Sequence, residues 1–353
     1  MYLKKDTKDI LYLIGRYRNA IMGFAALYIL FFHEWIVITG EDSAFYFAEK
    51  FIKRIGFYGV DIFFFLSGMG LIYSIEKHNV LEFYKRRFVR VFIPFFIMAI
   101  IISINKEWGM ETFLKNVFGI NFYIKSIYSY LWFVPAIMNL YILFPIYYFF
   151  FKKSPNKGQF TMAVLIIWLF LAVYFRDNIR FDLYGFINRI PIFLIGVLAG
   201  WTSKEREIKF TGLTWGICLM TFGLGLYFAY LTCYKGYYLV VPSSNCCIPN
   251  ILLSITTSCL LAKIFYFCDE KLKLFGKAVM KVFVFFGTIS LEFYCVQEWL
   301  AKILKKKFPD TWDDMVINIA VFIAVTITAI ALYGVCKLIH ISFGKIKKII
   351  RSR

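Results

Sequence analysis

The chain has 353 residues, of which 60% are apolar and 21% aromatic, and its formal net charge is +19. A soluble domain has roughly 45–50% apolar residues, so this composition excludes a soluble globular protein. The basic residues lie in short links between long apolar runs, where Lys and Arg mark the cytoplasmic side of a membrane. We therefore do not expect nucleic-acid binding despite the positive charge.

The N-terminal segment is basic, and its first apolar run covers residues 20–38. This run is too long for the apolar region of a cleaved signal peptide, and it lacks a cleavage site with small residues. We expect a retained signal-anchor helix.

Apolar runs of about the length needed to cross a bilayer of roughly 30 Å recur along the chain. They predict an all-α integral membrane protein, a bundle of about ten transmembrane helices that forms a single domain over residues 1–353. The predicted spans are 20–38, 56–75, 88–105, 130–150, 161–175, 185–202, 211–232, 249–268, 281–300 and 315–338.

The distribution of Lys and Arg predicts the orientation of the bundle. With the N-terminus inside, these residues are about twice as frequent in the cytoplasmic segments as in the outer ones. Both termini are therefore expected in the cytoplasm. One group of lysines, at 302 and 305–307, is an exception, because this orientation places it outside. An interfacial helix at these residues would account for it.

The cysteines show no metal-type spacing, and most lie within apolar spans as small fillers. Cys233, Cys246 and Cys247 share one predicted outer loop. A disulfide among them and free thiols are both compatible with the sequence.

A bundle without a soluble domain is compatible with a transporter, a channel or a membrane-embedded enzyme. Ionisable residues are costly inside a bilayer and tend to be functional there. They are therefore the residues that distinguish between these classes.

His33 and Asp61 each lie five residues from the outer end of their predicted spans, about 7.5 Å deep at 1.5 Å per residue. At equal depth, the carboxylate could orient the imidazole and raise its basicity, as a general base requires. The alternative is an interfacial histidine that hydrogen-bonds a neighbour.

A basic cluster, Lys85, Arg86, Arg87 and Arg90, lies at the cytoplasmic end of the third span. Guanidinium groups bind phosphate in a bidentate manner, so this cluster is a candidate clamp for an anionic cytosolic donor. The positive-inside rule alone could also account for it.

Other polar or aromatic residues in the spans are weaker candidates. Glu292 is an intramembrane carboxylate, and Gly196 and Gly200 have the spacing of a close helix contact. The remaining candidates are Ser67, Trp132, Tyr141 and Arg189.

Taken in order, these segments resemble the membrane-bound acyltransferase 3 family. The resemblance extends from about residue 16 to residue 300 and rests on five segments after the histidine of the first span. They are GVDIFFFLSG, RRFVRVFIP, LWFVPAIMNLYILFP, RIPIFLIGVLAG and GTISLEFYCVQ.

The resemblance implies a ten-helix enzyme of the bacterial plasma membrane. It would move an acyl group, often acetyl, from cytosolic acyl-CoA to a hydroxyl of a cell-surface carbohydrate or lipid-linked saccharide, with membrane lipids around it. It implies no bound cofactor and no metal. His33 matches the essential histidine of the family. Asp61 and Ser67 match the aspartate and serine of its GVD…SG segment, and Arg86, Arg87 and Arg90 match its basic cluster.

Three positions depart from the family pattern. Met22 stands where most members have an arginine, on nearly the same helical face as His33. Arg18, one turn below, could substitute, although helical side chains lean toward the N-terminus and away from His33. Ile137 and Met138 replace glutamates, and Gln297 replaces a second histidine.

These observations favour an acyltransferase in which His33, oriented by Asp61, deprotonates the acceptor hydroxyl. Direct transfer and an acyl-enzyme route remain open. A translocator of a lipid-linked or small saccharide, or a non-catalytic scaffold with the same fold, are the alternatives. The acceptor, the acyl group and the oligomeric state do not follow from the sequence.

Overall fold

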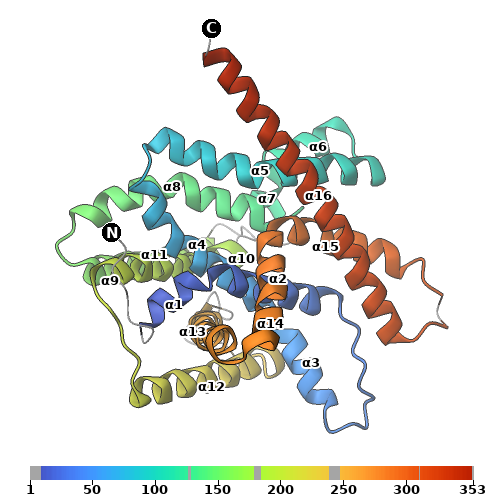
Figure 1. The fold of residues 1–353 in the computed structure, drawn as a ribbon, viewed down its shortest axis with the longest axis horizontal. Coiled ribbons are helices and arrows are strands. Elements are labelled where there is room, and N and C mark those ends of the chain that lie inside the picture. The colour runs from blue at the N-terminus through green and yellow to red at the C-terminus, as the bar shows by residue number, and fades with distance from the viewer. Residues whose placement is uncertain (1–8, 126–128, 179–183, 238–246, 310, 352–353) are drawn as a thin grey trace.

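The computed structural model describes residues 9–125, 129–178, 184–237, 247–309 and 311–351. Within these ranges the regular structure is helical, apart from one isolated bridge between Asp9 and Lys209. The expected all-α bundle is confirmed (Figure 1).

The bundle is built from long helices and several short ones. The long helices are α2 (Arg18–Glu34), α4 (Gly59–Ile75), α5 (Val80–Asn105), α8 (Phe133–Lys153), α9 (Lys157–Asn178), α11 (Ile190–Glu205), α12 (Gly212–Tyr234), α13 (Cys247–Lys271), α14 (Lys273–Thr288), α15 (Ser290–Lys305) and α16 (Asp314–Arg351). The short ones are α1 (Ile10–Arg16), α3 (Tyr46–Ile55), the 3₁₀ turn η1 (Gly56–Tyr58), α6 (Met110–Val117), α7 (Ile120–Lys125) and α10 (Tyr184–Ile187).

About ten spans were predicted, and the described residues contain nearly that number of suitable helices. Among the described residues, 8 helices are long and apolar enough to cross a membrane, or 9 if a bent pair counts as one. That pair is α14 and α15, which meet at 75°, so the predicted span 281–300 is not one straight helix. The first predicted span, 20–38, is α2, which ends at Glu34 and has only 17 residues.

Helix α4 lies at the centre and packs most closely on α11 through glycines. A Cβ on Gly68 would lie 2.2 Å from the carbonyl oxygen of Phe193, and one on Gly196 would lie 2.2 Å from that of Phe65. The expected role of these small residues, close approach of two backbones, is confirmed. Because the backbones of α4 and α11 are in direct contact, the positions of the two helices relative to each other are fixed, and so are the positions of the side chains that they carry.

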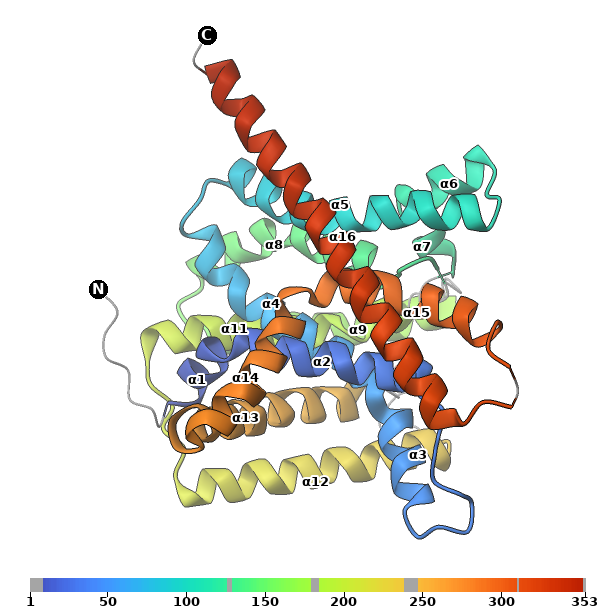
Figure 2. The same ribbon diagram turned by 45° about the vertical axis from the view of Figure 1, so that its right-hand side comes forward.

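The basic connections gather at one end of the bundle. In Figure 2 the links α4–α5, α8–α9, α11–α12 and α13–α14 lie at the left, which is the end predicted to be cytoplasmic. Arg16 of α1 pairs there with Asp269 of α13 at 3.0 Å, and Lys204 of α11 pairs with Glu76. We call this the inner end, and the opposite end the outer end.

At the outer end, α15 carries two of the lysines that were predicted outside. Lys305 pairs with Glu34 of α2 at 3.1 Å. The amide of Asn318 on α16 exchanges two hydrogen bonds of 2.8 Å with the backbone of Ile36. Cys246 of the predicted outer loop lies outside the described residues.

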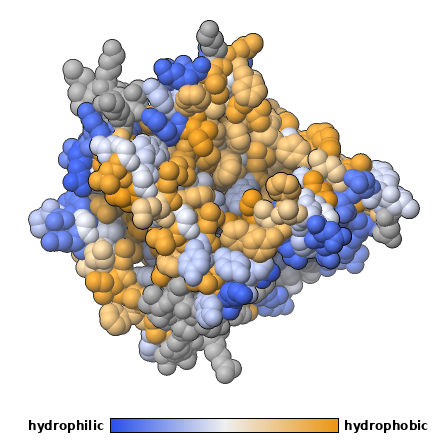
Figure 3. Space-filling model, turned by 90° about the horizontal axis from the view of Figure 1, so that it is seen from below, coloured by the Kyte–Doolittle hydropathy of each residue, from blue (hydrophilic) through white to orange (hydrophobic). Residues whose placement is uncertain are grey.

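The outward surface between these ends is apolar. Figure 3 shows a mainly hydrophobic face whose strongly hydrophilic residues lie mostly toward its left and right edges. Exposed large side chains such as Phe170, Met220 and Ile327 come from different helices. A broad apolar belt with polar ends matches a bilayer in thickness and polarity.

Candidate active site

A cavity of about 90 Å³ lies inside the bundle, between α2, α4, α5, α8 and α15. Its polar wall includes Ser67, Tyr141, Ser290 and Tyr294. Its apolar wall includes Met22, Ile29, Val60, Phe63, Phe133 and Ile137. Polar and apolar side chains thus both line the cavity.

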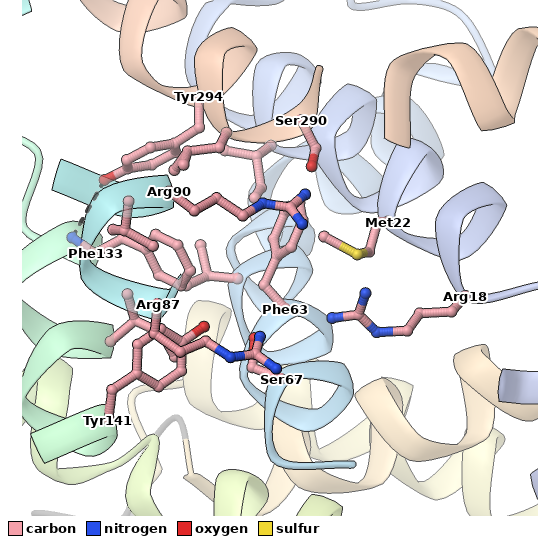
Figure 4. Close-up of a pocket in the computed structure, with 15 residues that line it drawn as sticks. Arg18, Met22, Phe63, Ser67, Arg87, Arg90, Phe133, Tyr141, Ser290 and Tyr294 are labelled. Atoms are coloured by element: carbon pink, nitrogen blue, oxygen red, sulfur yellow. Dashed lines mark hydrogen bonds between the residues drawn. The ribbon is translucent and has the colours of Figure 1, made fainter. Parts of the chain in front are cut away.

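Three arginines, Arg18, Arg87 and Arg90, line this cavity together. Their guanidinium groups are directed toward the same space, with Met22 and Ser67 beside them (Figure 4). Among the described residues, none of the three forms an ion pair with a carboxylate. Cations that converge without carboxylate partners favour an anionic ligand.

Two of the four residues of the predicted basic cluster line the cavity, and two do not. Arg87 and Arg90, three residues apart, face the cavity, and the Arg87 guanidinium lies 5.8 Å from the centre of the Tyr141 ring. Lys85 and Arg86 are exposed, and Arg86 pairs with Glu82 at 2.9 Å. Only half of the cluster is thus placed to hold a ligand in this cavity.

Arg18 enters the cavity one turn below Met22. Its Nε donates to the carbonyl oxygen of Leu66 at 3.4 Å. The guanidinium lies against Gly70 of α4, where a Cβ would be 3.7 Å away, an ordinary van der Waals contact. The cavity therefore keeps a guanidinium from α2 although position 22 is a methionine.

His33 lies at the outer end of α2 and is exposed. It continues the helical face of Met22 and Ile29, one turn beyond Ile29, or about 5.4 Å further along the axis. Glu298 and Lys302 of α15 are the charged groups that act on it. Glu298 lies one turn beyond Tyr294 on α15, so His33 and Glu298 each lie one turn beyond a residue that lines the cavity.

The predicted His33–Asp61 pair is not formed. Asp61 is fully buried and accepts a hydrogen bond of 2.9 Å from Asn250, and its other oxygen lies 3.6 Å from Nε of Arg189. In the part of the chain that the structure describes, no hydrogen bond or ion pair joins His33 to Asp61. Val60, Phe63 and Ser67 turn one face of α4 to the cavity, and Asp61 faces α11 and α13 instead.

Two further candidates join Asp61. Arg189 precedes α11, and its guanidinium lies 5.5 Å from the centre of the Trp132 ring, which gives a cation–π contact. Asn250, in the first turn of α13, is not among the candidates predicted from the sequence. The feature that could have indicated it is a polar amide just inside a predicted span, next to Pro249.

Glu292 and Gln297 lie inside α15 and do not line the cavity. Glu292 is 8% exposed, and Arg90 is the basic group that acts on it. Gln297 is 1% exposed, and its side-chain oxygen has no partner among the described residues. Neither residue is placed to contact a ligand in the cavity.

No group of three or more His, Cys, Asp or Glu residues forms a metal site in the described ranges. What the site offers is a basic inner part, an apolar middle and a histidine beyond its outer part. This order suits a long ligand with an anionic end at the inner side of the bundle.

Comparison with known families decides the class of protein. Residues 19–335 match the model of an acyltransferase domain, the acyltransferase 3 family. The chain belongs to this acyltransferase family. The match covers nearly the whole chain and confirms the resemblance inferred from the motifs. No curated protein and no solved structure matches the chain.

Family membership makes the chain a multi-pass membrane acyltransferase. Of the residues that depart from the family pattern, Met22 and Ile137 line the cavity, and Met138 and Gln297 do not. The first two departures therefore alter the wall of the candidate site.

Proposed function

We propose that this acyltransferase moves an acyl group, most simply acetyl, from cytosolic acyl-CoA to a hydroxyl of a cell-surface polysaccharide or its lipid-linked precursor. The observation that carries the proposal is the convergence of Arg18, Arg87 and Arg90 on one cavity. The phosphates of coenzyme A supply ion-pair partners, which these cations do not have among the described residues. The setting is the plasma membrane of a bacterium, with acyl-CoA on the inner side.

In this mechanism the phosphates stay at the basic part and the pantetheine arm runs along the apolar wall. The thioester then lies toward the outer part of the cavity, near Tyr294. His33 takes the proton of the acceptor hydroxyl, and the oxygen attacks the thioester carbonyl. The new C–O bond replaces the C–S bond, and the thiolate of coenzyme A leaves with the proton from the histidine.

Neighbouring arginines provide a matched test of the donor site. Membranes that contain Arg87→Ala should show a KM for acetyl-CoA raised about tenfold or more, because a charge-assisted phosphate contact is lost. Arg86→Ala removes the same charge from the exposed face of the same helix and should leave KM unchanged.

The assay is the transfer of label from radiolabelled acetyl-CoA to the carbohydrate and lipid fractions, with His33→Ala as a further control. Label that appears with the wild-type chain and not with His33→Ala supports the proposal. Equal effects of Arg86→Ala and Arg87→Ala would contradict the donor site. Movement of a saccharide without consumption of acyl-CoA would instead indicate a translocator.

A further inference from the structure

A second polar site lies beside the donor cavity, at the outer end of the bundle. It consists of Asp61, Arg189 and Asn250, which come from α4, α11 and α13. Each lies in or next to the first turn of its helix, at the ends of α4, α11 and α13 that are predicted to be outer. Helix α4 is preceded there without a break by η1 and α3, which form one span with it, Tyr46–Ile75.

The cluster contains polar atoms whose hydrogen-bonding capacity is unused. In the described part of the chain, Oδ1 of Asp61, Oδ1 of Asn250 and Nε of Arg189 are buried and have no hydrogen-bond partner. The Asp61–Arg189 distance of 3.6 Å is too long for a hydrogen bond between them. Buried polar atoms are costly when unpaired, so a site with three of them is built to receive partners.

The kinds of atom that are unpaired define the class of ligand. Oδ1 of the neighbouring Asn188 is also buried without a partner, which makes three acceptors and one donor. A phosphate or carboxylate brings acceptors alone, so it would leave these three oxygens unpaired and meet the negative charge of Asp61. Hydroxyl groups both donate and accept, and a ligand with several hydroxyls satisfies all four atoms.

The cluster also adjoins the donor cavity through the main chain. Asp61 follows Val60 directly, and Trp132, which holds the Arg189 guanidinium, directly precedes Phe133. Val60 and Phe133 both line the cavity. A ligand bound at the cluster is thus one side chain away from the apolar end of the donor cavity.

We infer that the Asp61–Arg189–Asn250 cluster is a saccharide-binding site that holds the acceptor at the outer end of the bundle. The inference rests on the proposed function for the role of the bound saccharide, but the site itself is a binding site that needs no turnover. Arg189 and Asn250 are then acceptor-binding residues, and Asp61 binds acceptor hydroxyls and does not orient His33.

The test uses the full chain in detergent and a panel of methyl glycosides: methyl glucoside, methyl galactoside and methyl N-acetylglucosaminide. Saturation-transfer NMR detects weak binding of such probes without any reaction. We expect a signal for at least one glycoside with the wild-type chain and with His33→Ala. Asn250→Ala should lose most of it, because it removes the unpaired Oδ1 that would accept from a ligand hydroxyl and the amide that donates to Asp61.

Asn116→Ala is the matched control, because Asn116 is a buried asparagine on α6 outside the cluster. It should bind the glycosides as the wild type does. Should Asn250→Ala not fold, Asn250→Leu fills the same space with apolar atoms and carries the same expectation. Folding is checked by size-exclusion chromatography.

Where a glycoside is also acylated, Asn250→Ala should raise its KM about tenfold and leave the KM for acetyl-CoA unchanged. Wild-type binding that survives in Asn250→Ala, or no binding of any glycoside by the wild type, would overturn the inference. Such a failure is distinguishable from failure of the proposed function. In the latter case glycosides bind at Asn250 but no label from acetyl-CoA is transferred.

Discussion

Asp61 and Arg189 face each other across α4 and α11, with 3.6 Å between Oδ1 and Nε, and both are buried. The carboxylate that the sequence assigns to His33 is therefore committed to a guanidinium in the bundle interior. Removal of one partner from a buried ion pair leaves an uncompensated charge, which is more costly than removal of both.

Asp61→Asn should consequently lower stability as well as turnover. We expect the free energy of unfolding to fall by about 3 kcal/mol, because Arg189 keeps its buried charge without a counter-ion. The double variant Asp61→Asn with Arg189→Gln should recover part of this loss. Thermal unfolding in detergent measures both. A single variant as stable as the wild type would show that the pair carries no such energy.

Arg18 is expected to replace the arginine that position 22 lacks. Its guanidinium reaches the same cavity as Arg87 and Arg90, so Arg18→Ala should raise the KM for acetyl-CoA about tenfold. Met22→Arg in that background should restore part of the affinity, because Met22 lines the same wall. Steady-state kinetics with labelled acetyl-CoA test both variants. An unchanged KM for acetyl-CoA in Arg18→Ala would show that Arg18 does not take the role of the missing arginine.

Glu298 is expected to assist His33 in place of Asp61. Its charge acts on the histidine from α15, and a negative charge stabilises the imidazolium that forms when the histidine takes a proton. Glu298→Gln should lower kcat several-fold, by about 1 kcal/mol of activation free energy, without a change in the KM for acetyl-CoA. Glu298→Asp should recover activity in part. If the KM for acetyl-CoA rose by the same factor by which kcat fell, the variant would instead have damaged the structure.

The contact between α4 and α11 is expected to tolerate no side chain at Gly196. A Cβ there would lie 2.2 Å from the carbonyl oxygen of Phe65, so Gly196→Val should separate the helices and destabilise the chain by about 3 kcal/mol. Gly216→Val on α12 is the control, because nothing lies within 4 Å of a Cβ at that position. The yield of monodisperse protein and its unfolding temperature compare the two. Equal behaviour would mean that the close contact is not required.

Much of the site followed from local patterns. The motif order identified the family, and helical periodicity explains why Ser67 shares a face with Val60 and Phe63. The same periodicity places Arg90 beside both Arg86 and Arg87, so only the structure shows that Arg87 and not Arg86 lines the cavity. The partner of Asp61 did not follow, because depth in the membrane defines only one coordinate and not the neighbouring helix.

The sequence by itself determined the membrane class, the family, the approximate spans and the residues that carry charge into the bundle. Hydropathy and helical periodicity suffice for these features, because they depend on residues that are close in the chain. Only the tertiary structure decided that Asp61 pairs with Arg189 and Asn250, that Arg18 shares the cavity of Arg87 and Arg90, and that α14 and α15 bend by 75°. These features depend on which distant helices pack side by side, and contacts through backbone such as Gly196 on Phe65 set that arrangement.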